Sequence, residues 1–278
     1  MIVCADLHLR LDVPICRDET EEEWFRLQRK TLHALKGEQV KVFVGDISHK
    51  AVSSPKLINL FLSMMGPEEV FIMAGNHDLQ MRNPDPSNTS YGTLAHSFPD
   101  ISEQWAVVPY GETKPIGCKD NKDLLFMHRF IVKDANDIIP GMDAISAHDL
   151  LALYPDYKVI VAGDNHSGFI YEENGRKVLV PGAMTRQIAS AIDKMPYMYY
   201  IDDALNITPY LLPDTGNMVS RGHLEKDEER ETRITAFISA LKEGGEVSLD
   251  FEENVRLALQ ANKLKEETEM LIKELVYV

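Results

Sequence analysis

The chain has 278 residues, of which 44% are hydrophobic and 26% charged, a composition typical of a folded globular protein that excludes disorder throughout. The formal charge of −15 opposes nonspecific attraction to nucleic acid over most of the surface. A polyanionic substrate therefore requires a local positive zone, which bound metal ions can supply.

The three cysteines form no CxxC pair, so they indicate neither a disulfide framework nor a zinc ribbon. No run approaches the roughly 18 to 20 apolar residues of a membrane span. The first residues, MIVCADLHLR, lack a basic leader and a long apolar core. We therefore expect a cytoplasmic protein with no membrane partner.

Short apolar runs rich in β-branched residues recur along the first part of the chain, and each ends in a polar loop. They predict buried strands at 2–5, 40–44, 70–74, 124–127 and 159–162. Apolar residues at helical spacing lie between the first three runs, over 24–35 and 57–64. This β-α-β-α-β order predicts a layered α/β architecture.

The later part of the chain has the pattern of an antiparallel extension. The runs 169–171 and 178–180 flank an Asn-Gly turn and predict a hairpin, and 197–201 and 207–211 predict two further strands. The turn-rich residues 213–223 predict a linker. The expected domains are thus residues 1–212 and a helical segment, 224–278.

The C-terminal segment carries an amphipathic stripe from Leu257 to Leu275, with apolar residues at alternating four- and three-residue steps. Two interpretations stay open at this point. The helix packs on its own domain, or it docks to a partner.

Carboxylate, amide and imidazole side chains follow the five predicted strands of the first domain. Strand ends at one edge of an α/β sheet converge, so these side chains are expected to meet. The seven candidate metal ligands are Asp6, His8, Asp46, Asn76, His128, Asp164 and His166. This mixed set exceeds what one divalent ion needs, and a shared carboxylate can bridge two ions.

The ordered motifs DLH, GD, GNHD, a lone His and a final GxxH resemble those of the calcineurin-like metallophosphoesterase superfamily, over residues 1–212. The stretches GDISHK and GDNHSG, the latter followed by VLVPGAMTR, resemble SbcD-type DNA-repair nucleases and their bacteriophage recombination relatives. The resemblance implies a four-layer α-β-β-α sandwich, here with a C-terminal helical appendage.

The resemblance also implies a role for each candidate ligand. The first metal would be held by Asp6, His8, Asp46 and His166. The second metal would be held by Asp46, Asn76, His128 and Asp164. Asp46 would bridge the two ions.

Three neighbouring residues match the family's catalytic groups. His77 corresponds to the histidine that protonates the leaving oxygen, a role suited to an imidazole. Asp78 is expected to orient His77, as a carboxylate often does for an imidazole. His49 corresponds to a histidine that positions the phosphate in SbcD-type enzymes.

The chain departs from the family pattern at Asp164, where the usual sequence GHxH places a histidine. A third carboxylate gives the second site an oxygen donor in place of an imidazole nitrogen, so the donor set is harder in the acid–base sense. This favours Mn²⁺ over Zn²⁺, with Mg²⁺ as the alternative. It also penalises a dianionic monoester more than a monoanionic phosphodiester. The other interpretation of Asp164 is a turn aspartate that caps its own loop.

Basic residues follow several ligand segments and form a candidate substrate surface. They are Arg10, Lys50, Arg82, Arg129 and Arg186. If they lie on one face of the protein, they would contact a nucleic-acid backbone. The alternative is a scatter of solvated charges.

These observations favour a metal-dependent DNA exonuclease or endonuclease, cytoplasmic, or in the host cytoplasm if phage-encoded. By resemblance it would form a homodimer and bind an SMC-like ATPase through residues 224–278. One alternative is a stand-alone phosphoesterase that acts on small nucleotides or phosphoproteins, since the fold does not fix the substrate. The other is a scaffold that has lost its metals.

Overall fold

A computed structural model describes residues 1–37, 39–65, 70–80, 83, 85–117, 123–222, 232, 234 and 235. Residues 1–220 form one compact unit. Among the helices of the described residues, none is both long and apolar enough to cross a membrane.

The first sheet has five strands in the order β13-β12-β1-β2-β3. Their bounds are Ile2–Cys4 for β1, Lys41–Val44 for β2, Val70–Met73 for β3, Tyr197–Ile201 for β12 and Ile207–Leu211 for β13. β1, β2 and β3 are parallel, whereas β12 and β13 add antiparallel strands at the other edge. The carboxyl ends of β1, β2 and β3 therefore lie side by side.

The second sheet has six strands in the order β10-β11-β9-β6-β4-β5. Their bounds are Ala106–Val108 for β4, Ile116–Gly117 for β5, Leu124–His128 for β6, Val159–Gly163 for β9, Phe169–Glu173 for β10 and Arg176–Val180 for β11. β4, β6, β9 and β11 are parallel, and β10 forms the predicted hairpin with β11. A separate pair joins β7 (Ile131–Val132) to β8 (Ile145–Ser146).

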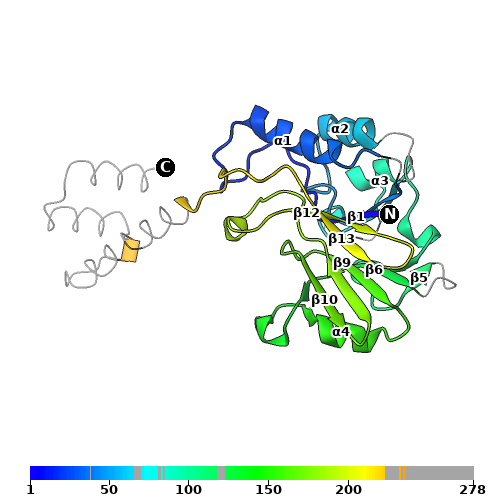
Figure 1. The fold of residues 1–278 in the computed structure, drawn as a ribbon. Helices are drawn as coiled ribbons and strands as arrows, with labels where there is room; N and C mark the ends of the chain where they lie inside the picture. The colour runs from blue at the N-terminus through cyan, green and yellow to red at the C-terminus, as the bar shows by residue number, and fades with distance from the viewer. Residues whose placement is uncertain are drawn as a thin grey trace, which may run out of the picture. The chain divides into compact units, whose positions relative to one another are not determined.

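The two sheets stack and are covered by helices on their outer faces, as Figure 1 shows. The helices are α1 (Glu21–His33), α2 (Pro55–Met65), α3 (Ser90–Leu94) and α4 (Ala147–Leu153), with 3-10 turns η2 (Ile101–Glu103), η3 (Ala135–Asp137) and η4 (Ala189–Ala191). α1 to α3 share a buried cluster with the first sheet, and α4 shares one with the second. A third cluster fills the space between the sheets.

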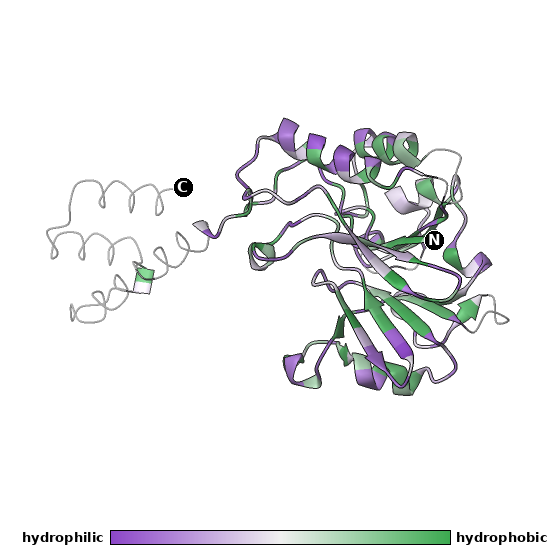
Figure 2. Ribbon diagram, in the orientation of Figure 1, coloured by the Kyte–Doolittle hydropathy of each residue, from purple (hydrophilic) through white to green (hydrophobic). Residues whose placement is uncertain are grey.

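The central strands of both sheets contribute alternate residues to two of these clusters, because successive side chains point to opposite faces. In β2, Val42 and Val44 face the other sheet while Phe43 faces the helices. In β6, Phe126 lies between the sheets while Leu125 and Met127 face α4. Figure 2 shows the resulting hydrophobic strands and the hydrophilic residues along α1.

The predicted four-layer α-β-β-α sandwich is thus confirmed, and the nine predicted strands lie within two residues of the observed ones. The sequence did not indicate β4, which is only three residues long yet pairs with β6 inside the second sheet. The predicted C-terminal helical appendage, apart from residues 232, 234 and 235, lies outside the described residues.

Helix α1 holds the loop that follows β1. It begins with a capping box in which Thr20 and Glu23 satisfy each other's backbone N–H groups. Gln28 is fully buried in the helix. Its amide donates to the carbonyl oxygen of Arg10 at 2.9 Å, and its Oε1 accepts from the Arg10 N–H at 3.0 Å.

A buried ion network attaches the segment after β13 to the rest of the unit. Asp214 accepts from Arg17 Nη1 at 2.7 Å, from the Arg186 N–H at 2.7 Å and from Arg186 Nη2 at 3.2 Å. All three side chains are buried, as is Val219 further along. The segment expected to be a linker therefore starts within the compact unit.

Replacement of Asp214 by Asn should destabilise the protein, because two buried guanidinium groups would lose their shared carboxylate. We expect the free energy of unfolding to fall by about 3–5 kcal/mol, the range for a broken buried ion pair. The measurement is urea denaturation with an unchanged m-value. Glu22→Gln removes the exposed pair with Arg26 and should cost less than about 1 kcal/mol. Equal losses in the two variants would contradict a structural role for the network.

Candidate metal centre

The seven candidate ligands lie at the carboxyl ends of five strands that belong to both sheets. Asp6 and His8 follow β1, Asp46 follows β2, and Asn76 follows β3. His128 ends β6, while Asp164 and His166 follow β9. Backbone hydrogen bonds join the loops, from the Asp6 N–H to Gly45 O at 3.2 Å and from the His8 N–H to Asp46 O at 2.9 Å.

Asp46 lies at the middle of the group. Its Oδ1 accepts from the backbone N–H of His77 at 2.9 Å. Its Oδ2 is buried and receives no hydrogen bond, yet lies 3.5 Å from His8 Nε2 and 3.4 Å from His128 Nε2. A buried carboxylate oxygen without a donor is costly, and this one faces an imidazole on either side. Oδ2 thus lies between potential metal-binding imidazoles on two sides.

One side of the centre contains Asp6, His8 and His166. The Nε2 atoms of the two histidines are 2.9 Å apart. Both carboxylate oxygens of Asp6 accept from the Asp164 N–H, at 3.0 and 3.2 Å. One donor atom from each of Asp6, His8 and His166 lies within 4.8 Å of the others, a spacing that suits a cation between them.

The other side contains His128, Asn76 and Asp164. His128 Nδ1 bonds to Val44 O at 2.9 Å, which directs Nε2 toward Asn76 Oδ1 at 3.0 Å and Asp164 Oδ1 at 4.0 Å. Asp164 therefore points its carboxylate into the centre and does not cap its own loop. The loop is held instead by Asn165, whose Oδ1 accepts from the Ser167 N–H at 2.9 Å.

The backbone of these loops is strained at four of the candidate ligands. Asp6, His8, Asp46 and Asp164 have positive φ angles of 52°, 46°, 54° and 90°. Such angles cost free energy in residues other than glycine, and they cluster at functional sites where the surroundings impose them.

The glycines of the motifs make room for the His128 ring. A Cβ atom on Gly45 would lie 2.1 Å from His128 Nδ1. A Cβ atom on Gly163 would lie 2.6 Å from the same nitrogen and 2.2 Å from Val44 O. Only glycine lets the two loops close on the imidazole.

His77 and His49 lie beside the first side of the centre. The His77 ring is 4.7 Å from the His8 ring and stacks on the His49 ring at 5.5 Å between centroids. His77 Nδ1 bonds to the carbonyl oxygen of His49 at 2.8 Å. This bond places the proton of the neutral ring on Nδ1 and leaves Nε2 for a substrate.

The predicted role of Asp78 was wrong, because its carboxylate does not orient His77. Instead it accepts from the N–H groups of Gly75, Ile47 and Ser48 at 3.0, 3.2 and 2.9 Å. Asp78 therefore ties the loop after β3 to the loop after β2. The carbonyl oxygen of His49 takes over the orienting role, which no sequence pattern indicates.

Burial and mutual repulsion shift the pKa values of the candidate ligands. Burial raises the pKa of Asp6 to about 8, helped by the nearby carboxylates of Asp46 and Asp164. Burial also lowers the pKa of His8 well below its usual value. For His128 the effect of burial is outweighed by the carboxylate of Asp46, which raises the pKa to about 10. Either protons or a divalent cation would neutralise the charge of these crowded carboxylates.

The basic residues proposed to contact substrate have different surroundings. Lys50 is exposed. Arg10 pairs with Asp12, and Arg129 pairs with Asp143 at 3.0 Å. The prediction for Arg186 was wrong, because its side chain is buried in the network with Asp214. Arg82 lies outside the described residues.

Two residues near the centre were missed in the sequence. The Gln187 amide donates to the carbonyl oxygens of Leu7 and His8, at 3.3 and 3.2 Å, and so holds the ligand loop after β1. Lys194 contacts the hydroxyl of Ser167, next to His166. Neither follows a strand directly, so their proximity comes from the tertiary fold.

The family model described as calcineurin-like phosphoesterase matches residues 1–168, a segment that contains all seven candidate ligands. The chain belongs to this family. Its members are metal-dependent phosphoesterases that generally bind two divalent metal ions, and the grouped Asp and His donors described above fit such a pair. No curated protein is significantly similar to the chain.

Similar solved structures include two crystal structures of Vps29 from Entamoeba histolytica. A single mutant is 17% identical, with 79% of this chain and 94% of that chain covered, at a TM-score of 0.39. The wild type, complexed with zinc, is 17% identical, with 77% and 93% covered, at a TM-score of 0.37. Such low TM-scores support no inference about this protein.

Divalent cations should stabilise the protein more at higher pH. The pKa of Asp6 rises from 3.8 when unfolded to about 8 when folded, so stability falls between these pH values if no cation is present. A bound cation keeps Asp6 ionised and removes that loss. We therefore expect Mn²⁺ to raise the Tm of chelator-treated protein more at about pH 8 than at about pH 6. A larger rise at the lower pH would contradict this charge assignment.

Gly163→Ala should weaken cation binding on the His128 side, because the new methyl group displaces the imidazole. We expect a loss in Mn²⁺ affinity of about 10- to 100-fold, as for other changes that misplace a metal-binding histidine. The measurement is calorimetric titration of Mn²⁺. Gly216→Ala is the matched control, since its Cβ would meet nothing closer than Met218 Cγ at 3.7 Å. Wild-type affinity in Gly163→Ala would refute the close-packing argument.

Proposed function

We propose that the protein is a two-metal phosphodiesterase that cleaves DNA, as the nuclease subunit of an SbcD-type repair or recombination complex. The observation that carries the proposal is the position of Asp46 Oδ2 between His8 and His128, with further donor groups on both sides and His77 alongside. The motifs GDISHK and GDNHSG support the choice of a nuclease within the phosphoesterase family.

In this proposal the donor residues are divided between two cations. Asp6, His8, His166 and Asp46 would hold one, and Asp46, Asn76, His128 and Asp164 would hold the other. Five oxygen donors, counting both contributions of Asp46, stand beside three imidazoles, and this hard set favours Mn²⁺ or Mg²⁺. When bound, two such ions neutralise phosphate oxygens and lower the pKa of an attacking water.

The residues around the cations would prepare the proton transfer. His77 donates its Nδ1–H to the His49 carbonyl oxygen, so its Nε2 carries the second proton when the ring is charged. That proton passes to the leaving oxygen of the ester. The His49 ring, stacked on His77, keeps the orientation of the acid and faces the same space as His8.

The third carboxylate supports a phosphodiester substrate. Two divalent ions and the carboxylates of Asp6, Asp46 and Asp164 leave one net positive charge, compared with two if residue 164 were histidine. A phosphodiester carries one negative charge and a monoester carries two near neutral pH, so the monoester loses more of its attraction. Asp164 faces His128 inside the centre, where this difference acts at short range.

DNA, a homodimeric state and an SMC-like ATPase remain part of the proposal through the SbcD-type resemblance. The segment proposed to bind the ATPase, 224–278, lies almost wholly outside the described residues. A pull-down of the ATPase by the full chain, compared with a chain lacking this segment, tests the partner.

A second candidate function, hydrolysis of small nucleotide diesters, is favoured by the surroundings of the arginines. Arg10 and Arg129 pair with aspartates, and Arg186 is buried, so fewer basic side chains than expected face a long backbone. A small diester needs fewer such contacts.

His77→Ala should lower the rate of DNA cleavage in Mn²⁺ by about 10²- to 10⁴-fold, because it removes the proton donor. The assay measures release from linear duplex and single-stranded DNA beside bis(p-nitrophenyl) phosphate. His33→Ala, at an exposed position near the end of α1, is the matched control and should keep wild-type rates. Cleavage of the small ester alone would favour the second candidate. Cleavage of neither substrate by the wild type would refute both.

A further inference from the structure

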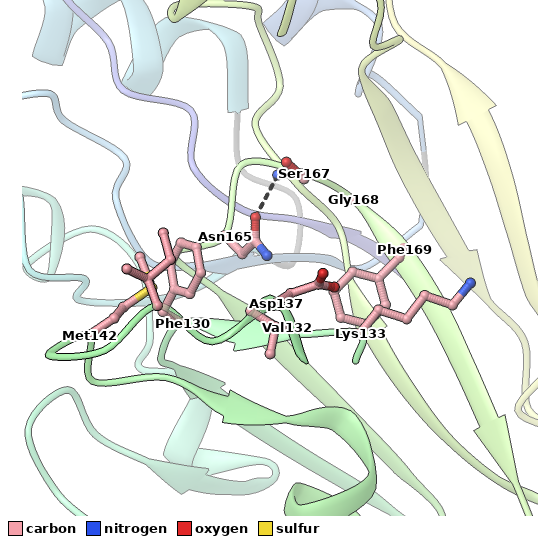
Figure 3. Close-up of a pocket in the computed structure, with 10 residues that line it drawn as sticks. Phe130, Val132, Lys133, Asp137, Met142, Asn165, Ser167, Gly168 and Phe169 are labelled. Carbon is pink, nitrogen blue, oxygen red and sulfur yellow. Dashed lines mark hydrogen bonds between the residues drawn. The ribbon is translucent and has the colours of Figure 1, made fainter. Parts of the chain in front are cut away.

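A pocket of about 360 Å³ opens beside the metal centre, and the functions described above do not use it. Its walls include the rings of Phe130 and Phe169 and the thioether of Met142. Figure 3 shows Phe130 and Met142 on one side and Phe169 with Lys133 on the other. The wall is therefore largely apolar and aromatic, which suits a flat ring better than a phosphate group.

The pocket is built from the same loops that carry the metal ligands. Phe130 lies two residues after His128, and Asn165 and Ser167 flank His166. The Asn165 side chain donates to the carbonyl oxygen of Ile131 at 2.8 Å and so ties the two loops together. A base bound in the pocket would therefore lie close to a phosphate at the metal centre.

We infer that this pocket receives an unpaired nucleobase of the nucleotide whose phosphate lies at the metal centre. The inference rests on the proposed phosphodiesterase function and specifies its substrate as a nucleotide chain with a base free to leave the stack. Stacking of a base on aromatic side chains tolerates any sequence, because every base has a π face.

The rim of the pocket suits a base as well. Lys133 and Asp137 are exposed at its edge and offer one donor group and one acceptor group. Opposite charges at the rim would hydrogen-bond the polar edge of a base but would not attract an anion strongly. A base within a duplex does not present its faces, so the strand must be single or frayed at this nucleotide.

The floor of the pocket is fixed by a close backbone approach. A Cβ atom on Gly168 would lie 2.5 Å from the Pro181 carbonyl oxygen, so the chain between His166 and Phe169 packs directly on the end of β11. Phe169 also packs against the cluster under the second sheet, whereas Phe130 does not belong to it. Phe130 is therefore the better residue to replace.

The test compares cleavage of the dithymidine phosphodiester with cleavage of analogues in which one or both bases are absent. The wild-type protein should cleave one of the single abasic analogues with a kcat/KM on the order of tenfold lower than the dithymidine, since stacking of one base is lost. Phe130→Ala should cleave these two substrates with equal kcat/KM. Phe130→Leu, which keeps an apolar side chain without a ring, should behave in the same way.

Phe25→Ala is the matched control, because Phe25 is a half-buried ring of α1 that contacts Lys56. It should keep the wild-type preference for the base. The doubly abasic analogue has no base to place in the pocket, so its cleavage rate depends only on the metal centre and on correct folding. Phe130→Ala should therefore cleave it at the wild-type rate.

Two results would overturn the inference while leaving the proposed function intact. The first is equal cleavage of all four substrates by the wild type. The second is a loss in Phe130→Ala that is proportional across the four substrates. If the wild type cleaved none of them in Mn²⁺, the proposed function itself would fall, and the assignment of the pocket with it.

Discussion

One constraint governs the centre of this protein: several acidic groups lie close to the buried carboxylate of Asp46. Asp46 Oδ2 has no hydrogen-bond donor and lies between His8 and His128, while Asp6 and Asp164 bring further carboxyl groups close by. Such a cluster is unfavourable in a low-dielectric interior unless cations or protons balance it. Burial and the neighbouring carboxylates raise the pKa of Asp6, and a pair of divalent ions is the compensation that the family membership indicates.

Much of the surrounding structure keeps these groups from moving apart. Asp78 ties two ligand loops through three backbone N–H groups, and Gln28 and Gln187 hold the loop after β1. Positive φ angles at four ligands and the missing side chain at Gly163 allow an approach that ordinary loops do not reach. The candidate ligands follow strands of both sheets and converge at one edge. The stacking of the two sheets therefore holds them in place.

The negative net charge of the protein bears on how it could attract a phosphate. With a charge of −15 and several arginines paired or buried, the proposed cations would be an important source of attraction for a phosphate. The apolar pocket beside Phe130 then offers contact area that does not depend on charge. In this proposal, substrate selection would arise from stacking as well as from electrostatics.

The sequence by itself determined the layered fold and the position of each candidate ligand along the chain, because alternating burial and strand-end polar residues are local patterns. Apolar runs as short as that at Val70 predicted the strands, and Gly45 and Gly163 marked the tight loops. The topology of parallel strands then placed the ligands at a common edge.

Only the tertiary structure decided which atoms meet. That Asp78 binds backbone N–H groups, that His49 orients His77 through a carbonyl oxygen and that Arg186 is buried against Asp214 depend on contacts between residues far apart in the chain. The partner of Arg186 lies 28 residues away, and that of Arg17 lies 197 residues away. Side-chain direction and partner choice are set by packing, on which a local pattern of residue types carries no information.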